Sequence, residues 1–387
     1  MVISNKKKEF LKNSKLNFYY EINKYKSTLK PTKEIEGFAS YVIVGEKNYP
    51  NLATHNISND NKISSYKNSS DIVKKEYDNI FKIKARNILG STNPVHVKNT
   101  SNRIQDEIRD IYKAKNIVNF SSNFSKELTF DKVVVNKVAG IVGSKNDLIS
   151  LNSTENTQTS KQVEKYCVED IKSREAIISL YERQVNEHQI INLLALGSFG
   201  ISINKKLVPS KWAITAYDQT IEKYLYKKIL NFKLINEYEI YSYLDKGNFF
   251  VIILFPDNFA ANIIETFPGA VEQDYVGVDN KLKKAEPETA GGFYATKIAV
   301  NEFLVSRKKQ ASYLTIRIIK DSEIPLGVVF VRECVRQALS KNALFCTSNK
   351  SELDKYLYEN FKEHFVYYLK SQILLEQKKT RKLSEFF

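Results

Sequence analysis

The segment from Lys205 to Asp218, KKLVPSKWAITAYD, gathers side chains that could hold a nucleic acid. It contains Lys205, Lys206 and Lys211, the single tryptophan of the chain, Trp212, and the carboxylate of Asp218. Lysine attracts phosphate, and an indole ring can stack on a base. Alternatively, Trp212 anchors a hydrophobic core and Asp218 caps a helix. The segment therefore predicts either a nucleic-acid contact or a packing element.

A second group of cations extends from Arg307 to Arg336 and includes Arg317, Arg332 and the neighbouring Glu333. Guanidinium groups bind phosphate through paired hydrogen bonds, so a strand-borne Arg317 facing Arg332 and Glu333 could form a phosphate clamp. The same side chains could instead form an internal ion-pair network. Both interpretations stay open at the level of sequence.

The carboxylates in these motifs raise the question of catalysis. In an enzyme acting on DNA or on a nucleotide adduct, Asp218, Glu302 or Glu333 would be the acid, base or metal ligand. One carboxylate per motif is few, because a metal-dependent nuclease normally shows a tighter acidic cluster. The four histidines lie in separate segments, and no GxxxxGK[ST] phosphate loop occurs. No metal or cofactor is therefore expected, and catalysis stays an open alternative.

Several apolar runs predict the strands that would position these residues. The run NFFVIILF, Asn248 to Phe255, is stopped by Pro256 and is typical of a strand buried on both faces. Further strands are expected at 39–45, 313–319 and 327–331, with a helix following the last of these into Arg336.

Helical periodicity alternates irregularly with these strands. Helices are expected at 170–182, at 187–196 before Gly197, and from 352 to about 375. A helix opened by Gly291-Gly292 should turn Ala295, Ile298, Ala299 and Phe303 inward, with Lys297 and Asn301 outward. Because no regular βαβ order appears, we expect an α+β fold with a central, mostly buried sheet.

Composition shifts suggest how the chain is divided. Residues 1–34 carry nine Lys against three Glu and are expected to form a basic arm. A first domain would span 35–275, with a flexible Ser/Thr/Asn-rich loop at 143–161. A second domain would span 285–375, and a tail would follow at 376–387.

The overall composition limits the class of protein. The 387 residues carry a formal charge of +15, with 42% hydrophobic and 12% aromatic residues, which is a globular composition. No apolar run approaches the roughly 20 residues of a membrane span, and the N-terminus does not resemble a secretory signal. Three scattered cysteines predict a reducing cytoplasm. The positive charge favours a nucleic acid as partner, although a diffuse Lys excess defines no site.

Several motifs, in the same order along the chain, resemble the archaeal Nre family, whose members are described as DNA-repair proteins that bind the sliding clamp PCNA. The motifs are LLALGSFG, KKLVPSKWAITAYD, GGFYATKIAVNEFL and IPLGVVFVRECVRQA, with Val44-Gly45, Tyr49-Pro50 and DIKSREAIISLY upstream. The resemblance covers nearly all of the chain after the basic arm. It implies a role in DNA repair.

The chain departs from the family pattern at three places. Family members often carry an N-terminal cysteine cluster thought to bind a metal, and here no cysteine precedes Cys167. A basic-Tyr-Gly sequence of the family is replaced by Glu46-Lys47-Asn48, and Thr-Arg-Trp is replaced by Ser210-Lys211-Trp212. Lys211 keeps the positive charge of the family's Arg but cannot make the paired hydrogen bonds of a guanidinium group.

The final residues, QKKTRKLSEFF, resemble a PCNA-interacting peptide of the form Q-x-x-L-x-x-F-F, with Thr380 in place of its Gln. Leu383, Phe386 and Phe387 would share one face of a helical turn and could enter a hydrophobic pocket. Burial of three such side chains contributes roughly 5–9 kcal/mol, and ordering a free tail opposes this by roughly 2–5 kcal/mol. We therefore expect micromolar to millimolar affinity for the tail alone. Alternatively, the tail docks on its own domain.

Taken together, the residues and the resemblance predict a cytoplasmic DNA-damage repair factor. It would bind PCNA through Thr380, Leu383, Phe386 and Phe387, and DNA through its main body. The candidate phosphate-binding residues are Lys205, Lys206, Lys211, Trp212, Arg307, Arg317, Arg332 and Arg336. Two alternatives remain: an enzyme acting on DNA or nucleotide adducts, and a non-catalytic scaffold that links the clamp to other repair proteins.

Overall fold

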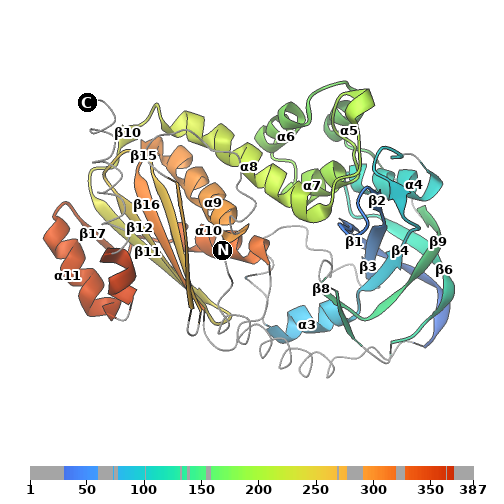
Figure 1. Ribbon diagram of the computed structural model, residues 1–387, viewed down its shortest axis with the longest axis horizontal. Helices are drawn as coiled ribbons and strands as arrows, with labels where there is room; N and C mark the ends of the chain where they lie inside the picture. Colours follow the sequence, from blue (N-terminus) through green and yellow to red (C-terminus); the bar gives the residue numbers. More distant parts are fainter. Residues whose placement is uncertain are drawn as a thin grey trace. The chain divides into compact units, whose positions relative to one another are not determined.

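The computed structural model describes residues 30–59, 73, 77–100, 102–130, 133–136, 140–153, 158–267, 270–276, 291–319, 327–362 and 364–369. The described residues up to Ile221 form one compact unit, and those from Glu222 onward form a second. Both units combine helices and strands (Figure 1), which confirms the α+β class. In the part of the chain that is described, no helix is long and apolar enough to cross a membrane.

The first unit contains a closed barrel of five strands: β1 (Thr32–Val44), β3 (Thr54–Asn59), β4 (Ile88–Ser91), β6 (Asn119–Leu128) and β9 (Ser144–Ser153). Around the barrel the order is β1, β3, β4, β9, β6 and back to β1. Only β4 and β9 pair in parallel, and the other neighbours are antiparallel. Numbered along the chain, this order is 1-2-3-5-4, which is the topology of the OB-fold, a five-stranded barrel used to bind oligonucleotides and oligosaccharides.

Helices and short strands surround this barrel. The helices are α3 (Tyr77–Ala85), α4 (Arg103–Lys113), α5 (Lys161–Val168), α6 (Ser173–Glu182) and α7 (Glu187–Ala195), with a 3₁₀ turn η3 (Ser202–Asn204). Two short pairs complete the unit: β2 (Asn51–Leu52) with β5 (Val95–His96), and β7 (Val134–Asn136) with β8 (Gly140–Val142). The side chain of Asn186 accepts hydrogen bonds at the start of α7, and Gly197, with φ of 70°, follows its end. The helices predicted at 170–182 and 187–196 are thus confirmed to within a few residues.

The second unit is built on a six-stranded sheet. Its strand order is β14 (Ala270–Val276), β13 (Ala261–Phe267), β16 (Ser312–Ile319), β12 (Asn248–Phe255), β11 (Tyr238–Asp245) and β17 (Phe345–Thr347). Only β13 and β16 are parallel neighbours. The predicted strands at 248–255 and 313–319 are confirmed, and they lie at the centre of this sheet. A separate parallel pair joins β10 (Lys233–Leu234) to β15 (Lys309–Gln310).

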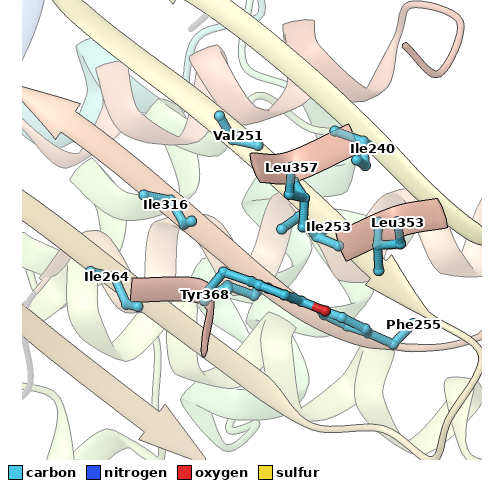
Figure 2. Packing of buried hydrophobic residues seen from close by; sticks show 10 residues of the cluster. Ile240, Val251, Ile253, Phe255, Ile264, Ile316, Leu353, Leu357 and Tyr368 are labelled. Atoms are coloured by element: carbon cyan, nitrogen blue, oxygen red, sulfur yellow. The ribbon is translucent and has the colours of Figure 1, made fainter. Parts of the chain in front are cut away.

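Helices cover both faces of this sheet. On one side lie α9 (Gly291–Arg307) and α10 (Val328–Leu339), and on the other lies α11 (Lys350–Asn360), as Figure 1 shows. Beneath α11, apolar side chains of four strands pack against Leu353, Leu357 and Tyr368 (Figure 2). On the α11 side the buried cluster is apolar except for the hydroxyl of Tyr368, whereas the α9 and α10 side also buries charged side chains such as Lys297 and Arg332. Helix α8 (Ser210–Ile229) contributes residues to both units.

Four local predictions are corrected by the structure. Residues 144–153 form strand β9 instead of a loop; Ser144, Leu148 and Leu151 are buried, while Lys145 and Asp147 are among the exposed residues. Residues 328–331 begin helix α10 and are not a strand. The predicted long helix ends at Asn360 before helical structure resumes at residue 362. Residues 1–29 of the predicted basic arm lie outside the described residues, so the arm stays a prediction, and β1 begins at Thr32.

The fourth correction concerns α9. Lys297 and Asn301 were expected on its outer face, yet their side chains are buried, with exposures of 2% and 0%. Helix α9 packs against the sheet and against α10, and it also contacts Glu222 of α8, so polar positions are covered too. A polar residue in a helical pattern indicates the solvent side only where one face of the helix reaches solvent.

Candidate nucleic-acid interface

Three loops of the first unit are held side by side by main-chain hydrogen bonds. The amide of Val97 donates to the carbonyl of Pro50 at 2.8 Å, and the amide of Leu207 donates to the carbonyl of Val97 at 2.8 Å. The turn before Pro50 is closed by a 2.7 Å hydrogen bond from the amide of Asn51 to the carbonyl of Asn48. These bonds bring the β1–β3 loop, the segment after β5 and the segment before α8 together.

The start of α8 is fixed against the same region. The side-chain oxygen of Ser210 accepts a buried 2.8 Å hydrogen bond from the amide of Val44, the last residue of β1. Two residues further on, the ring of Trp212 lies against the ring of Tyr49, with centroids 5.5 Å apart and planes tilted by 44°. Tyr49 is 49% exposed and Trp212 is 48% exposed. The result is a solvent-exposed aromatic pair whose backbone is held by hydrogen bonds.

The alternative interpretation of this segment does not fit the geometry. Trp212 is half exposed and is therefore not a core anchor. Asp218 lies in the middle of α8 and is buried, so it does not cap the helix.

Exposed lysines occur on each of the three joined loops, at Lys47, Lys98 and Lys206, and a fourth, Lys211, lies in the first turn of α8. We call these four lysines together with Tyr49 and Trp212 the aromatic–lysine surface. Lys205 differs from them, because it is half-buried and its ammonium donates to the carbonyl of Cys167 at 2.7 Å. Glu46 adds an exposed acidic side chain to the loop before Tyr49. Cations beside stacked aromatic rings are the combination found in grooves that bind single-stranded nucleic acids.

Sequence reasoning identified only half of this surface. Lys206, Lys211 and Trp212 were candidates, whereas Lys98 gave no signal and Tyr49 entered only through the Tyr49-Pro50 motif of the family resemblance. The pairing of Tyr49 with Trp212 depends on contacts between segments far apart in the chain.

The arginine candidates lie in the second unit, and their guanidinium groups are engaged inside it. Arg317 donates to Glu265 at 2.8 Å, and through Nε and Nη2 to Asn248 at 2.9 and 2.5 Å. Arg332 is completely buried, with 0% exposure. Arg317 therefore belongs to an internal network, and the complete burial of Arg332 likewise argues against an open phosphate clamp.

The two more exposed arginines are also paired with carboxylates. Arg307 makes a bidentate contact with Glu239 at 2.8 and 2.5 Å, and Glu239 also accepts from Tyr241 at 2.6 Å. Burial raises the pKa of Glu239, but hydrogen bonds from Arg307 and Tyr241 outweigh it, so the net shift is downward. This pair therefore stays ionised at neutral pH and offers little capacity for a phosphate.

Arg336 engages two of the three acidic candidates. Its Nε and Nη2 donate to Glu302 at 2.8 and 2.9 Å, and its Nη1 contacts Glu333. The third candidate, Asp218, is assigned to the first unit. Among the described residues, no group of three or more His, Cys, Asp or Glu side chains could hold a metal ion. Glu302 and Glu333 thus contribute to ion pairing with Arg336, and the acidic candidates do not assemble a metal site in the described structure.

The second unit also contains a buried polar cluster on α9 and a small pocket beneath α11. Lys297 forms a buried ion pair with Glu222, and the side-chain amide of Asn301, one turn along α9, has no hydrogen-bond partner among the described residues. A pocket between α11 and the sheet, near Phe365 and Tyr368, measures about 10 Å³, which is room for about one water molecule. The pair is buried and the pocket is too small for a nucleotide.

The clamp-binding candidates Thr380, Leu383, Phe386 and Phe387 lie outside the described residues. Their assignment to PCNA binding therefore rests on the sequence alone.

Comparisons with known proteins find similarity over most of the chain. Residues 13–271 match the family described as "Archaeal Nre, N-terminal", and residues 279–386 match "Archaeal Nre, C-terminal". A DNA repair protein NreA of Haloferax volcanii is 27% identical over 338 residues, which cover 82% of this chain and 80% of the relative.

Two relatives from Archaeoglobus fulgidus are matched over shorter stretches. Its DNA repair protein NreA is 33% identical over 51% of this chain and 52% of the relative, and its DNA repair protein NreB is 33% identical over 46% and 47%. In these two alignments the chain spans about half the length of the curated relatives. No solved structure is matched.

Proposed function

Since this chain belongs to the archaeal Nre family, we propose that it is a cytoplasmic DNA-damage repair factor that is recruited to the sliding clamp PCNA and contacts DNA directly with its main body. The repair role is supported by the names of the relatives, DNA repair proteins NreA and NreB. The DNA contact is supported above all by one observation: the exposed Tyr49–Trp212 pair, with lysines on all three adjoining loops.

Electrostatics favour this surface over the arginine-rich part of the second unit. Lys206 and Lys211 are exposed, and their ammonium groups can release counterions when they approach phosphate. The guanidinium groups of Arg317 and Arg336 already contact carboxylates, so binding a phosphate would first require breaking those buried or half-buried ion pairs. The phosphate contact is therefore assigned to lysines in the first unit.

The salt dependence of DNA affinity tests this assignment. In fluorescence anisotropy titrations, log affinity should fall linearly with log salt, with a slope of about −0.9 per phosphate neutralised on duplex and about −0.7 on single strands. The double variant Lys206→Ala/Lys211→Ala should make the slope shallower by about 1 to 2. The matched control, Lys227→Ala/Lys233→Ala, removes two exposed lysines assigned to the second unit and should leave the slope unchanged.

Two results would count against a DNA contact here. If the wild-type chain shows no binding at low salt, the scaffold that links PCNA to other repair proteins becomes the better description. If the control variant changes the slope as much as the lysine pair does, the diffuse charge of +15 is responsible and no defined surface is involved.

Clamp docking is assigned to the tail by the spacing of its apolar residues. If the tail formed one helical turn, Leu383, Phe386 and Phe387 would share a face, while Ser384 and Glu385 would point away from it. Thr380 stands one turn before Leu383 and can still donate or accept a hydrogen bond. Lysines and arginine between Lys378 and Lys382 would speed association with an acidic clamp surface.

A calorimetric titration of the full chain with PCNA tests the docking. Phe386→Ala/Phe387→Ala should abolish measurable binding, because each ring contributes about 1.5–3 kcal/mol when buried. The matched control, Ser384→Ala/Glu385→Ala, changes two positions off that face and should bind nearly as well as wild type. Unchanged binding by the phenylalanine variant would show that PCNA, if bound at all, is contacted elsewhere.

A further inference from the structure

We propose that the aromatic–lysine surface binds unpaired nucleotides of single-stranded DNA, with a base stacked on the Tyr49–Trp212 pair; this rests on the DNA contact proposed above and specifies its substrate. Base pairs in a duplex have both faces covered by neighbouring base pairs and expose only their edges in the grooves. An exposed aromatic ring can therefore stack only on a base that has left the duplex or was never in one.

The exposure and tilt of the two rings fit stacking on one base, and they do not fit a packing contact within the core. Each ring is about half exposed, so each is covered on part of its surface and open on the rest. The 44° tilt and 5.5 Å centroid separation rule out a parallel stack, and the two rings present differently inclined surfaces to solvent. Because main-chain hydrogen bonds at Pro50 and Val97 and the bond from the Val44 amide to the Ser210 side chain hold both segments, little ordering is required when a base binds.

The lysines add a backbone contact on several sides of the rings. They lie on three different segments, at Lys47, Lys98, and Lys206 with Lys211. A single strand is flexible enough to bring successive phosphates to such dispersed cations while one base stacks between them. A rigid duplex presents phosphates at fixed positions and gains no stacking, so it should bind more weakly at the same salt concentration.

The barrel supports the same assignment and limits the size of the site. Tyr49 lies in the loop between the first and second barrel strands, one of the two loops with which OB-folds hold oligonucleotides. OB-folds also use the surface of their second and third strands, but here every residue of β4 and all residues of β3 except His55 are buried. The ligand is therefore confined to the loop end of the barrel, and we expect a site of only a few nucleotides.

The single tryptophan makes a direct test possible with the full-length chain. Trp212 is the only indole in the sequence, so all tryptophan fluorescence reports on this surface. Titration with an oligothymidylate of about ten nucleotides should quench it, whereas a blunt-ended duplex of matched charge should quench it little. Binding would be followed in parallel by anisotropy of labelled DNA.

Variants distinguish stacking from simple proximity. Trp212→Ala should weaken binding of the oligothymidylate by about 5- to 150-fold, and Tyr49→Ala by a similar or smaller factor, while Trp212→Phe retains most affinity. Tyr358→Ala is the control, because Tyr358 is also about half exposed but belongs to α11 of the second unit. Circular dichroism spectra identical to wild type would show that the exposed-site variants fold.

These measurements test base stacking, the preference for single strands and DNA binding separately. If DNA binds but Trp212 fluorescence does not change and Trp212→Ala has wild-type affinity, base stacking at this surface is wrong while DNA binding stands. If duplex binds as tightly as the single strand, the preference for unpaired nucleotides is wrong. If no DNA binds at low salt, the proposed DNA contact itself fails.

Discussion

Replacing Glu222 with Gln should expose how the second unit is held together. The side chains of Glu222 and Lys297 are 1% and 2% exposed, and the carboxylate contacts the ammonium directly. Burial lowers the pKa of Lys297, and the negative charge of Glu222 partly opposes this. Without Glu222, Lys297 must either remain charged with no counter-ion or fold in its neutral form.

The size of the effect follows from these two routes. Losing one partner of a buried pair typically costs about 3–5 kcal/mol. Deprotonating a lysine of ordinary pKa at pH 7 costs about 1.4 kcal/mol for each of roughly 3.4 units, which is close to 5 kcal/mol. We therefore expect Glu222→Gln to lower the free energy of unfolding by about 3–5 kcal/mol at pH 7.

The stability deficit of Glu222→Gln should depend on pH, and its direction can be stated. When Lys297 folds in its neutral form, the unfolded chain binds more protons than the folded chain, so stability increases with pH. The deficit of Glu222→Gln relative to wild type should shrink by up to about 1.4 kcal/mol per unit between pH 7 and 10.

Urea unfolding followed by circular dichroism at several pH values would measure this deficit. Glu222→Leu/Lys297→Met removes both charges and should be close to wild type or more stable. A deficit of Glu222→Gln below about 1 kcal/mol, or one that is independent of pH, would refute the buried pair.

Three further predictions concern other parts of the structure. Burial, aided by the charge of Lys145, lowers the pKa of His55 to about 4. The free energy of unfolding should therefore fall by at most about 3 kcal/mol as the pH drops from 6.5 to 4. His55→Gln should remove this loss in thermal melts. Arg317→Met should cost about 3 kcal/mol by leaving Glu265 unpaired; unchanged stability with weaker DNA binding would instead support a phosphate clamp. Gly197→Ala should lower the free energy of unfolding by about 1–3 kcal/mol, because φ is +70° at this position. It should also weaken DNA binding, since the added Cβ would lie 2.7 Å from the backbone of Lys206. Wild-type DNA affinity of this variant would show that binding does not depend on the position of the Lys206 loop.

Local signals were sufficient for the most apolar and best-delimited elements. The apolar run of β12 identified a strand buried on both faces, and Gly197 marked the end of α7. Such elements are specified by residues adjacent in the sequence, so composition and spacing suffice. The α+β class followed from the irregular mixture of these elements.

The barrel could not be predicted in the same way. Strand β9 contains mostly Ser, Asn and other polar residues, and its inward positions are filled by only a few side chains such as Leu148 and Leu151. Its identity as a strand depends on pairing with β6 and, in parallel, with β4. Pairings between distant segments leave no local pattern, so the OB-type order became visible only in three dimensions.

The candidate site shows the same division. Trp212 and its neighbouring lysines were identified from one segment, but Tyr49 and Lys98 are brought beside them by hydrogen bonds between loops. The arginines were ambiguous in sequence because a guanidinium group suits a phosphate and a carboxylate equally well. Only the positions of Glu265, Glu302 and other partners decide between the two.

Photo-crosslinking would locate the DNA contact most directly. An oligothymidylate carrying 4-thiothymidine would be irradiated with the full-length chain, and modified residues would be identified by mass spectrometry. The aromatic–lysine surface predicts adducts at Tyr49 or Trp212, or on the lysines beside them, and their loss under competition with unlabelled single strands. Adducts confined to the first 29 residues, the tail or the second unit would contradict a DNA contact at this surface.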